Sequence, residues 1–299
     1  MRVIWPWQDR GHGWSWLKAG TFALMFAPAI WLIDQLRTGE FGPVPLGGLT
    51  YWSGLWATAL LLLALAITPA VTILRFGRLV IVRRMIGVTA LVYTIAHIVI
   101  YFALRLWDFM RIGREMVTRP SLILAMVATL GLIALGATSL DVAVERMGLS
   151  WQRLHNTVYA VTALALIHYL LSPGIFPDQY LTCGMFFWLM SWRLLARRRL
   201  GADALALTAL AVVSTLFTAL LEAGWVWAYH GYEPAGTLAA NFSLELGVPA
   251  AWKMLALGLA IALVAALRPA RKRTEASARP PERRQRRAGA WRRGAGGTT

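Results

Sequence analysis

Three histidines, His97, His155 and His168, lie within long apolar stretches of the sequence, whereas His12 and His230 lie in polar segments. An ionisable side chain inside a membrane span is costly to bury, so its presence there indicates a functional site. Neutral imidazole is a good ligand for iron, and ligation offsets the cost of burying the polar ring. The first three histidines are therefore the leading candidates for chemistry.

The spacing of these residues predicts their depth in a bilayer. His97 lies fourteen residues after Arg83, and His168 lies thirteen residues after His155. At a rise of 1.5 Å per residue these separations are about 21 and about 20 Å. His97 and His168 are thus expected at one depth in the outer half of the membrane. Two imidazoles at one depth on two helices can ligate a b-type haem from opposite faces.

An inner site at Arg83 and His155 is a weaker expectation. Thirteen steps of 100° leave His155 and His168 about 140° apart around a regular helix. They share a face only if the helix is distorted or begins after His155. Protonated arginine is also a poor iron ligand.

Two alternatives to haem ligation apply to the membrane histidines. They could hydrogen-bond between helices, or they could form a proton relay. A relay usually includes Asp or Glu, and the centres of the apolar runs contain neither.

The residues around the histidines predict an all-α, polytopic transmembrane bundle. Of 299 residues, 58% are hydrophobic and 15% are charged, unlike a soluble domain. Runs near the 20 residues needed to span a bilayer must be helical, because lipid cannot satisfy backbone polar groups. We place eight of them at 17–36, 51–74, 85–106, 120–140, 154–172, 179–196, 204–227 and 250–268. The first is interpreted as an uncleaved helix despite the signal-peptidase-like Ala27-Pro28-Ala29.

Charge predicts the orientation of the bundle. Arginine-rich loops at 75–84 and 193–199 are expected in the cytoplasm, which places both termini there. The segment 268–299 carries eleven Arg or Lys and two Glu, within a chain of net charge +16. We expect it to be a disordered tail that contacts anionic lipid. We do not expect it to bind nucleic acid, because no folded nucleic-acid-binding element accompanies the charge.

Several functions are disfavoured by what the sequence lacks. Its single cysteine, Cys183, excludes an internal disulfide, a CxxC motif and a cysteine-ligated metal. It has no GxGxxG, P-loop or HExxH motif and no soluble flavin or nicotinamide domain. Electrons would therefore arrive from another protein or a quinone. A transporter with structural histidines remains an alternative; Pro28 and Pro69 could break helices, but no carboxylate accompanies them.

Five short motifs resemble the YedZ/MsrQ family, and the resemblance covers roughly residues 17–200. They are Arg83-Arg84-Met85-Ile86-Gly87, Ala96-His97, Val117-Thr118-Arg119-Pro120, Trp151-Gln152-Arg153-Leu154-His155-Asn156-Thr157-Val158-Tyr159 and Ile167-His168-Tyr169. The resemblance implies a six-helix haem b protein of the bacterial inner membrane, similar to ferric reductase membrane domains and also associated with FMN. It implies haem-binding roles for His97, His155 and His168, and a cofactor role for Arg83.

The same resemblance implies an electron-transfer role. Family members pass electrons from the quinone pool or a cytosolic flavin reductase to MsrP, a periplasmic molybdopterin enzyme that reduces methionine sulfoxide in oxidised proteins. A ferric-reductase-like cytochrome b with another acceptor is the alternative within redox chemistry. We expect an N-terminal arm at 1–16, a six-helix core at 17–200, two further helices at 201–268 and the tail at 269–299. The core is expected to bind haem without the two further helices, which depart from the family pattern and would pack against the core or dock a partner.

Overall fold

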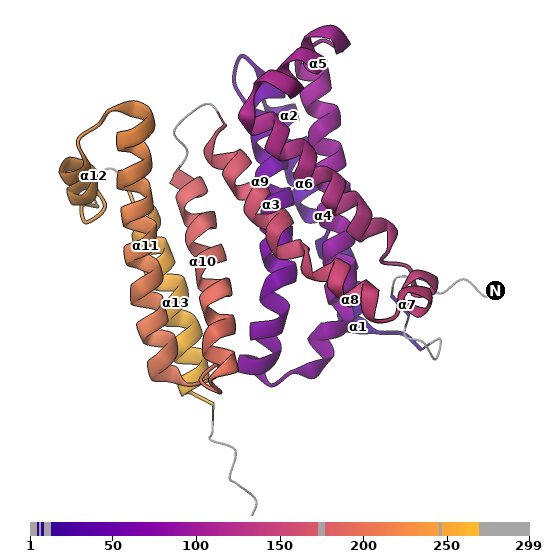
Figure 1. Cartoon of the computed structure of the whole chain (residues 1–299), viewed down its shortest axis with the longest axis vertical. Helices are drawn as coiled ribbons and strands as arrows, with labels where there is room; N and C mark the ends of the chain where they lie inside the picture. Colours follow the sequence, from indigo (N-terminus) through magenta and orange to yellow (C-terminus); the bar gives the residue numbers. More distant parts are fainter. Residues whose placement is uncertain (1–4, 6, 9–12, 173–176, 245–246, 269–299) are drawn as a thin grey trace, which may run out of the picture. The chain divides into compact units, whose positions relative to one another are not determined.

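Helices form all the regular structure of the described residues, apart from one isolated bridge between Gln8 and Trp14. The computed structural model describes residues 5, 7–8, 13–172, 177–244 and 247–268 (Figure 1), so the predicted tail at 269–299 lies outside it. In chain order the helices are α1 (Trp16–Leu24), α2 (Ala27–Thr38), α3 (Pro45–Leu74), the 3-10 turn η1 (Gly77–Leu79), α4 (Val80–Leu104), α5 (Phe109–Thr118), α6 (Pro120–Ala137), α7 (Asp141–Met147), α8 (Leu149–Asn156), α9 (Val158–Leu170), α10 (Pro177–Arg197), α11 (Ala204–His230), α12 (Pro234–Ala240) and α13 (Ala250–Ala266).

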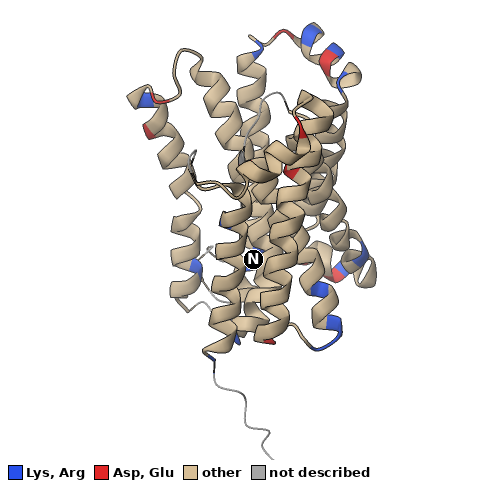
Figure 2. Cartoon of the chain, turned by 90° about the vertical axis from the view of Figure 1, so that its left-hand side faces the viewer, with Lys and Arg blue, Asp and Glu red and all other residues tan. Residues whose placement is uncertain are grey.

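The predicted all-α membrane bundle is confirmed. Five segments are long and apolar enough to cross a bilayer: Trp16–Thr38, Pro45–Leu74, Gly77–Leu104, Pro120–Ala137 and Ala204–His230. Helix α13 is apolar but shorter. Figure 2 shows that charged residues gather near helix ends and leave the middle of the bundle nearly free of them. The chain is a multi-pass membrane protein.

Two predicted runs are each divided into two helices. The run at 17–36 breaks between α1 and α2, ahead of Pro28. The Tyr93 hydroxyl bridges this break, because it accepts a hydrogen bond from the Ala29 amide and donates one to the Met25 carbonyl, both at 2.9 Å. The run at 154–172 is divided into α8 and α9, with Thr157 at the junction. Helix α3 continues through Pro69.

The segment around residues 108–119 is also more ordered than a loop. Most of it forms α5, whose first turn is capped by the Asp108 carboxylate accepting a hydrogen bond from the Arg111 amide at 3.0 Å. A side-chain acceptor at this position satisfies an amide that has no partner within the helix. Helix α5 leads directly into α6 and lies at the end of the bundle where α4 ends (Figure 1).

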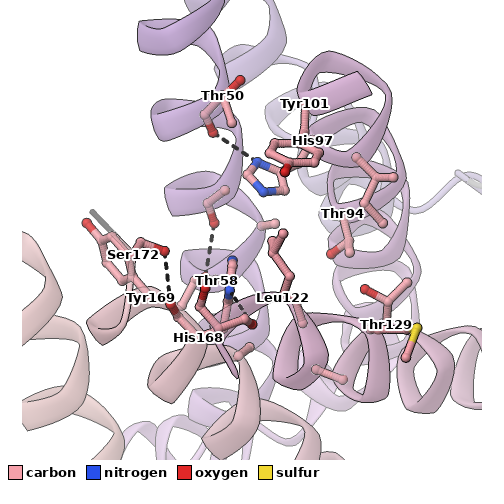
Figure 3. Close-up of a pocket in the computed structure, with 18 of the residues that line it drawn as sticks. Thr50, Thr58, Thr94, His97, Tyr101, Leu122, Thr129, His168, Tyr169 and Ser172 are labelled. Carbon is pink, nitrogen blue, oxygen red and sulfur yellow. Dashed lines mark hydrogen bonds between the residues drawn. The ribbon is translucent and has the colours of Figure 1, made fainter. Parts of the chain in front are cut away.

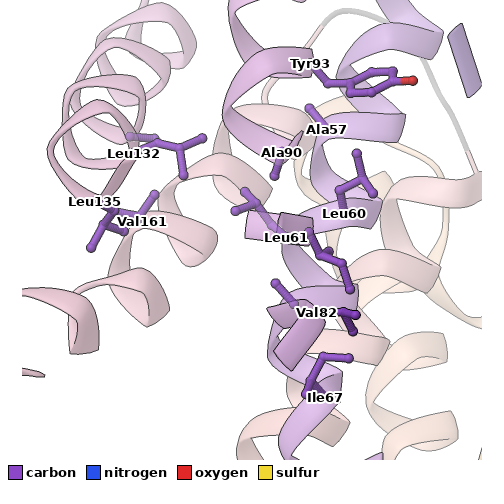
Figure 4. Packing of buried hydrophobic residues seen from close by; sticks show 13 residues of the cluster. Ala57, Leu60, Leu61, Ile67, Val82, Ala90, Tyr93, Leu132, Leu135 and Val161 are labelled. Atoms are coloured by element: carbon purple, nitrogen blue, oxygen red, sulfur yellow. The ribbon is translucent and has the colours of Figure 1, made fainter. Parts of the chain in front are cut away.

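One apolar cluster joins α3 and α4 to α6 and α9. Leu61, Ala90, Leu132 and Val161 are buried together within it (Figure 4). Burying such side chains removes them from lipid as well as from water, so close packing holds these helices together. The cluster fixes the four helices whose side chains line the site described below.

A second apolar cluster joins α3 to α10, α11 and α13. Leu65, Trp188, Leu207 and Met254 represent the four helices in it. Residues Met1–Ala266 form one compact unit, in which the predicted boundary at residue 200 falls between α10 and α11. The division into a core at 17–200 and two added helices remains a prediction.

Candidate functional site

A cavity of about 460 Å³ lies among α3, α4, α6 and α9. This volume falls within the range of about 300–1,000 Å³ that is typical of small-molecule and cofactor sites. Most of its walls are apolar, with contributions from Leu55, Ile98 and Leu122, and both His97 and His168 face it. The structure therefore brings these two predicted site residues into one cavity (Figure 3).

His97 is held by a main-chain carbonyl and a side-chain hydroxyl of the neighbouring helix α3. Its Nδ1 lies 2.9 Å from the Thr50 carbonyl oxygen and 3.2 Å from the Ser53 hydroxyl. A carbonyl oxygen only accepts hydrogen bonds, so Nδ1 carries the proton and the lone pair is on Nε2. Gly54 provides the space for the ring, because a Cβ at this position would lie 2.9 Å from His97 Cε1.

His168 has the same arrangement on a different pair of helices. Its Nδ1 lies 2.9 Å from the Ser121 carbonyl oxygen at the start of α6. The proton is therefore again on Nδ1, and Nε2 is the nitrogen with the lone pair. Histidines that bind metals usually donate their other N–H to a carbonyl or carboxylate, which fixes the tautomer and the orientation of the ring. Both imidazoles therefore have the tautomer and the held orientation that metal-binding histidines usually have.

A cluster of charged residues lies at one edge of the cavity. Arg105 and Arg119 line it, and Glu115 of α5 forms ion pairs with them at 3.1 and 3.4 Å. The hydrogen bond from Tyr101, together with the nearby arginines, lowers the pKa of the Glu115 carboxyl. Arg111 forms a further pair with Glu115 at 3.3 Å. Three arginines around one carboxylate leave a net positive charge, which suits an anionic ligand group.

A hydrogen-bonded pair of tyrosines forms another wall of the cavity. The Tyr169 hydroxyl donates to the Tyr51 hydroxyl at 3.1 Å, and the Tyr51 hydroxyl donates to Asp178 of α10 at 3.4 Å. Asp178 also lies 3.8 Å from the ammonium group of Lys253. Sequence reasoning missed this connection and the role of Glu115, because each joins residues that are remote in sequence or on separate helices.

His155 and Arg83 do not line the cavity. The His155 ring stacks on Trp151 with centroids 3.9 Å apart, and its Nδ1 lies 3.2 Å from the Trp151 carbonyl oxygen. Its Nε2 is buried and forms no hydrogen bond of normal geometry. Arg83 lies within electrostatic range of the ring. Among the described residues, no three His, Cys, Asp or Glu side chains gather as a metal site.

Comparison with known proteins first identifies the type of membrane domain in this chain. Residues 53–166 match the family model of the ferric reductase like transmembrane component. This match includes Gly54 and His97 and ends two residues before His168. Helices α10–α13 lie beyond it. No solved structure matched the chain.

The chain belongs to the MsrQ family. It is similar to the protein-methionine-sulfoxide reductase heme-binding subunit MsrQ of three bacteria. It is 36% identical to that of Cronobacter sakazakii over 167 residues, which are 55% of this chain and 84% of the relative. It is 36% identical to that of Caulobacter vibrioides over 196 residues, 64% of this chain and 90% of the relative. It is 37% identical to that of Yersinia enterocolitica over 163 residues, 53% of this chain and 80% of the relative.

Proposed function

We propose that the protein is the haem-binding electron-transfer subunit of a methionine sulfoxide reductase system, and that His97 and His168 ligate a b-type haem through Nε2. One observation carries the proposal. Two imidazoles on α4 and α9 face one cavity, and each has its Nδ1 hydrogen bond made to a main-chain carbonyl. Haem binding by the subunits named above supports it.

The rest of the cavity fits haem chemically. Its apolar walls suit a macrocycle, and Gly54 leaves space beside the His97 ring. Haem also carries two carboxylates. Arg105 and Arg119, both on the cavity wall, would pair with them, and Glu115 would hold these guanidinium groups in place.

Bound haem supplies one-electron transfer, since its iron alternates between two oxidation states. The chain orients both imidazoles, excludes water with apolar side chains and balances charge with arginines. The donor would be the quinone pool or a cytosolic flavin reductase, and the acceptor the periplasmic molybdopterin enzyme MsrP. Such a route would cross the bacterial inner membrane, and the arginine-rich loops at 75–84 and 193–199 favour an orientation with both termini in the cytoplasm.

An inner cofactor site at His155 and Arg83 is a second part of the proposal. The buried Nε2 of His155 forms no normal hydrogen bond, and Arg83 supplies a nearby positive charge. These groups could serve FMN or a second haem. The Arg83→Ala, His155→Ala double variant should slow electron delivery while the outer haem remains bound. Normal electron delivery in that variant would exclude the role.

Spectroscopy of the purified full-length protein tests the main proposal. A reduced-minus-oxidised spectrum should show the bands of a b-type haem with two imidazole ligands, and the haem-to-protein ratio should be at least one. A colourless protein that is fully helical and inserted in the membrane would support the alternative of a transporter with structural histidines.

A further inference from the structure

Glu222 is a carboxyl group well inside a membrane-spanning helix. It lies eight residues before His230, the last residue of α11, which is about 12 Å along the helix. In the spanning helices of the described residues, no other Asp or Glu lies more than two turns from both ends of its helix. An ionisable residue at this depth usually has a functional role.

The contact between α10 and α11 shows what Glu222 faces. A Cβ on Gly184 would lie 2.1 Å from the Thr218 hydroxyl, so these two positions are directly opposed. One turn further along the antiparallel pair, Tyr180 and Glu222 are opposed, and the two side chains interact electrostatically. The close contact of Gly184 with Thr218 therefore lies one helical turn from the side chain of Glu222.

Four side chains surround this region, and all of them have unpartnered polar atoms. Gln179 and Tyr180 are 0% exposed and Asn241 is 3% exposed. The atoms without a hydrogen-bond partner are Gln179 Nε2, Gln179 Oε1, Tyr180 Oη, Glu222 Oε2 and Asn241 Oδ1. Gln179 and Tyr180 are close enough to interact, and so are Glu222 and Asn241 at the end of α12, but neither pair forms a hydrogen bond of normal geometry. The four side chains therefore form one continuous polar group.

Buried polar atoms in proteins are almost always paired, with protein or with ordered water. A buried water typically makes about three hydrogen bonds to groups that would otherwise be unsatisfied. Five atoms on neighbouring side chains that lack a hydrogen bond of normal geometry therefore leave hydrogen-bonding capacity for ordered water. Donors and acceptors are both present, because the Gln179 amide donates while Glu222 and Asn241 accept.

We propose that Gln179, Tyr180, Glu222 and Asn241 form a buried site that holds ordered water and binds and releases one proton at Glu222. Release transfers the carboxyl proton to the bound water and leaves a carboxylate that the surrounding donors stabilise. The site lies on helices beyond the matched ferric-reductase-like segment. It does not depend on the cofactor proposed for the cavity.

Among the described residues, no cationic side chain forms an ion pair with Glu222. Tyr180 is the titratable group that faces it from α10, with Cys183 close to Tyr180. Helix α12 contributes the neutral Asn241, and the Glu233 carboxylate accepts hydrogen bonds from the first amides of α12. In α13 the charged residue is Lys253, which pairs with Asp178. A carboxyl group in such surroundings exchanges a proton rather than forming a permanent ion pair.

Infrared difference spectroscopy of the full chain in lipid vesicles tests this proposal during a pH titration. The wild type should show a carboxyl C=O band that disappears reversibly as the pH rises. Glu222→Gln should lack this band and retain its helical content. Tyr180→Phe should raise the midpoint by about one pH unit, because it removes a hydroxyl that would stabilise the carboxylate through the bound water. Tyr229→Phe, an exposed tyrosine of α11, is the matched control and should leave the midpoint unchanged.

Three results would overturn the proposal. Identical pH difference spectra of the wild type and Glu222→Gln would show that Glu222 does not titrate. A Glu222 band that stays constant across the titration would show a permanently neutral, structural carboxyl. A band that responds to sodium but not choline at fixed pH would identify a cation site instead. The haem-free His97→Ala variant should keep the titrating band, so failure of the haem assignment is distinguishable.

Discussion

The cavity beside α3 and the polar contact between α10 and α11 both place polar side chains inside a membrane bundle, but they satisfy them differently. In the cavity, each imidazole has one nitrogen paired with a main-chain carbonyl and the other available. At the contact, five polar atoms of four neighbouring side chains form no hydrogen bond of normal geometry. The first arrangement suits a rigid ligand with fixed bonding directions. The second suits small, mobile hydrogen-bonding molecules such as water.

The two sites therefore suit different occupants: the cavity suits a metal-containing cofactor, and the contact between α10 and α11 suits water. A nitrogen whose ring is already held loses little further freedom when it binds a metal. Amide, hydroxyl and carboxyl groups without partners instead depend on what enters the site, so the protonation of the carboxyl group can change with conditions. Substitutions that remove the preorganised groups should therefore have larger effects than substitutions at the hydrated site.

The largest effect is expected from removing either proposed haem ligand in the cavity. His97→Ala and His168→Ala should each lose most of the Soret absorbance per mole of folded protein, because each variant removes one of the two bonds that would attach the iron to the chain. His230→Ala, which changes an exposed histidine at the end of α11, should retain it. Full haem retention in both cavity variants would refute the assigned ligands.

A smaller effect is expected from filling the space beside His97. In Gly54→Ala the new methyl group would lie 2.9 Å from His97 Cε1, so the ring must move away from the Thr50 carbonyl. Disturbing a group that orients a metal ligand typically lowers affinity by about 10–100-fold. Haem titration of the apoprotein measures this loss. Gly87→Ala on α4 is the control, because its Cβ would meet nothing within 4 Å.

Much of the fold and of the cavity could be predicted from the sequence. Apolar runs locate the helices, and a constant rise per residue places His97 and His168 at one depth. The carbonyl partners of both imidazoles could not be predicted, because Thr50 and Ser121 lie 47 residues away along the chain. The sequence allows either a distorted helix or one that begins after His155, and α9 begins at Val158. Glu222 could not be predicted as a site, because it lies away from the centre of its run and its surroundings come from three helices.

Widening the contact between α10 and α11 should change stability more than haem binding. In Gly184→Ala the added Cβ would lie 2.1 Å from the Thr218 hydroxyl, so the Thr218 side chain must rotate or the two helices must separate. Overpacking of this kind costs about 1–3 kcal/mol. Thermal unfolding in detergent should show the loss, and Thr218→Ala in the same chain should recover part of it. An equal loss in Gly224→Ala, whose Cβ meets nothing within 4 Å, would argue against a specific contact.

The smallest effect is expected at Glu115, beside the cavity. The Tyr101 hydrogen bond and the arginines lower the folded-state pKa of Glu115 below its ordinary value of 4.5. The resulting stabilisation is therefore fully present above pH 4.5 and is lost as the pH falls through the folded-state pKa. We expect about 1 kcal/mol, because Arg111 and Arg119 are half exposed and solvent weakens their pairs.

Glu115→Gln measures this contribution in thermal unfolding of the haem-free protein, where no ligand carboxylates compete for the arginines. The variant should be less stable than the wild type at neutral pH, and the difference should shrink below pH 4.5 as the wild-type carboxyl is protonated. Glu145→Gln, an exposed glutamate of α7, is the control and should follow the wild type throughout. A difference that persists unchanged into acid would mean that Glu115 stabilises the fold through its shape and neutral hydrogen bonds rather than its charge. In that case Arg105 and Arg119 would be held beside the cavity by packing, and the charge of Glu115 would have no part in positioning them.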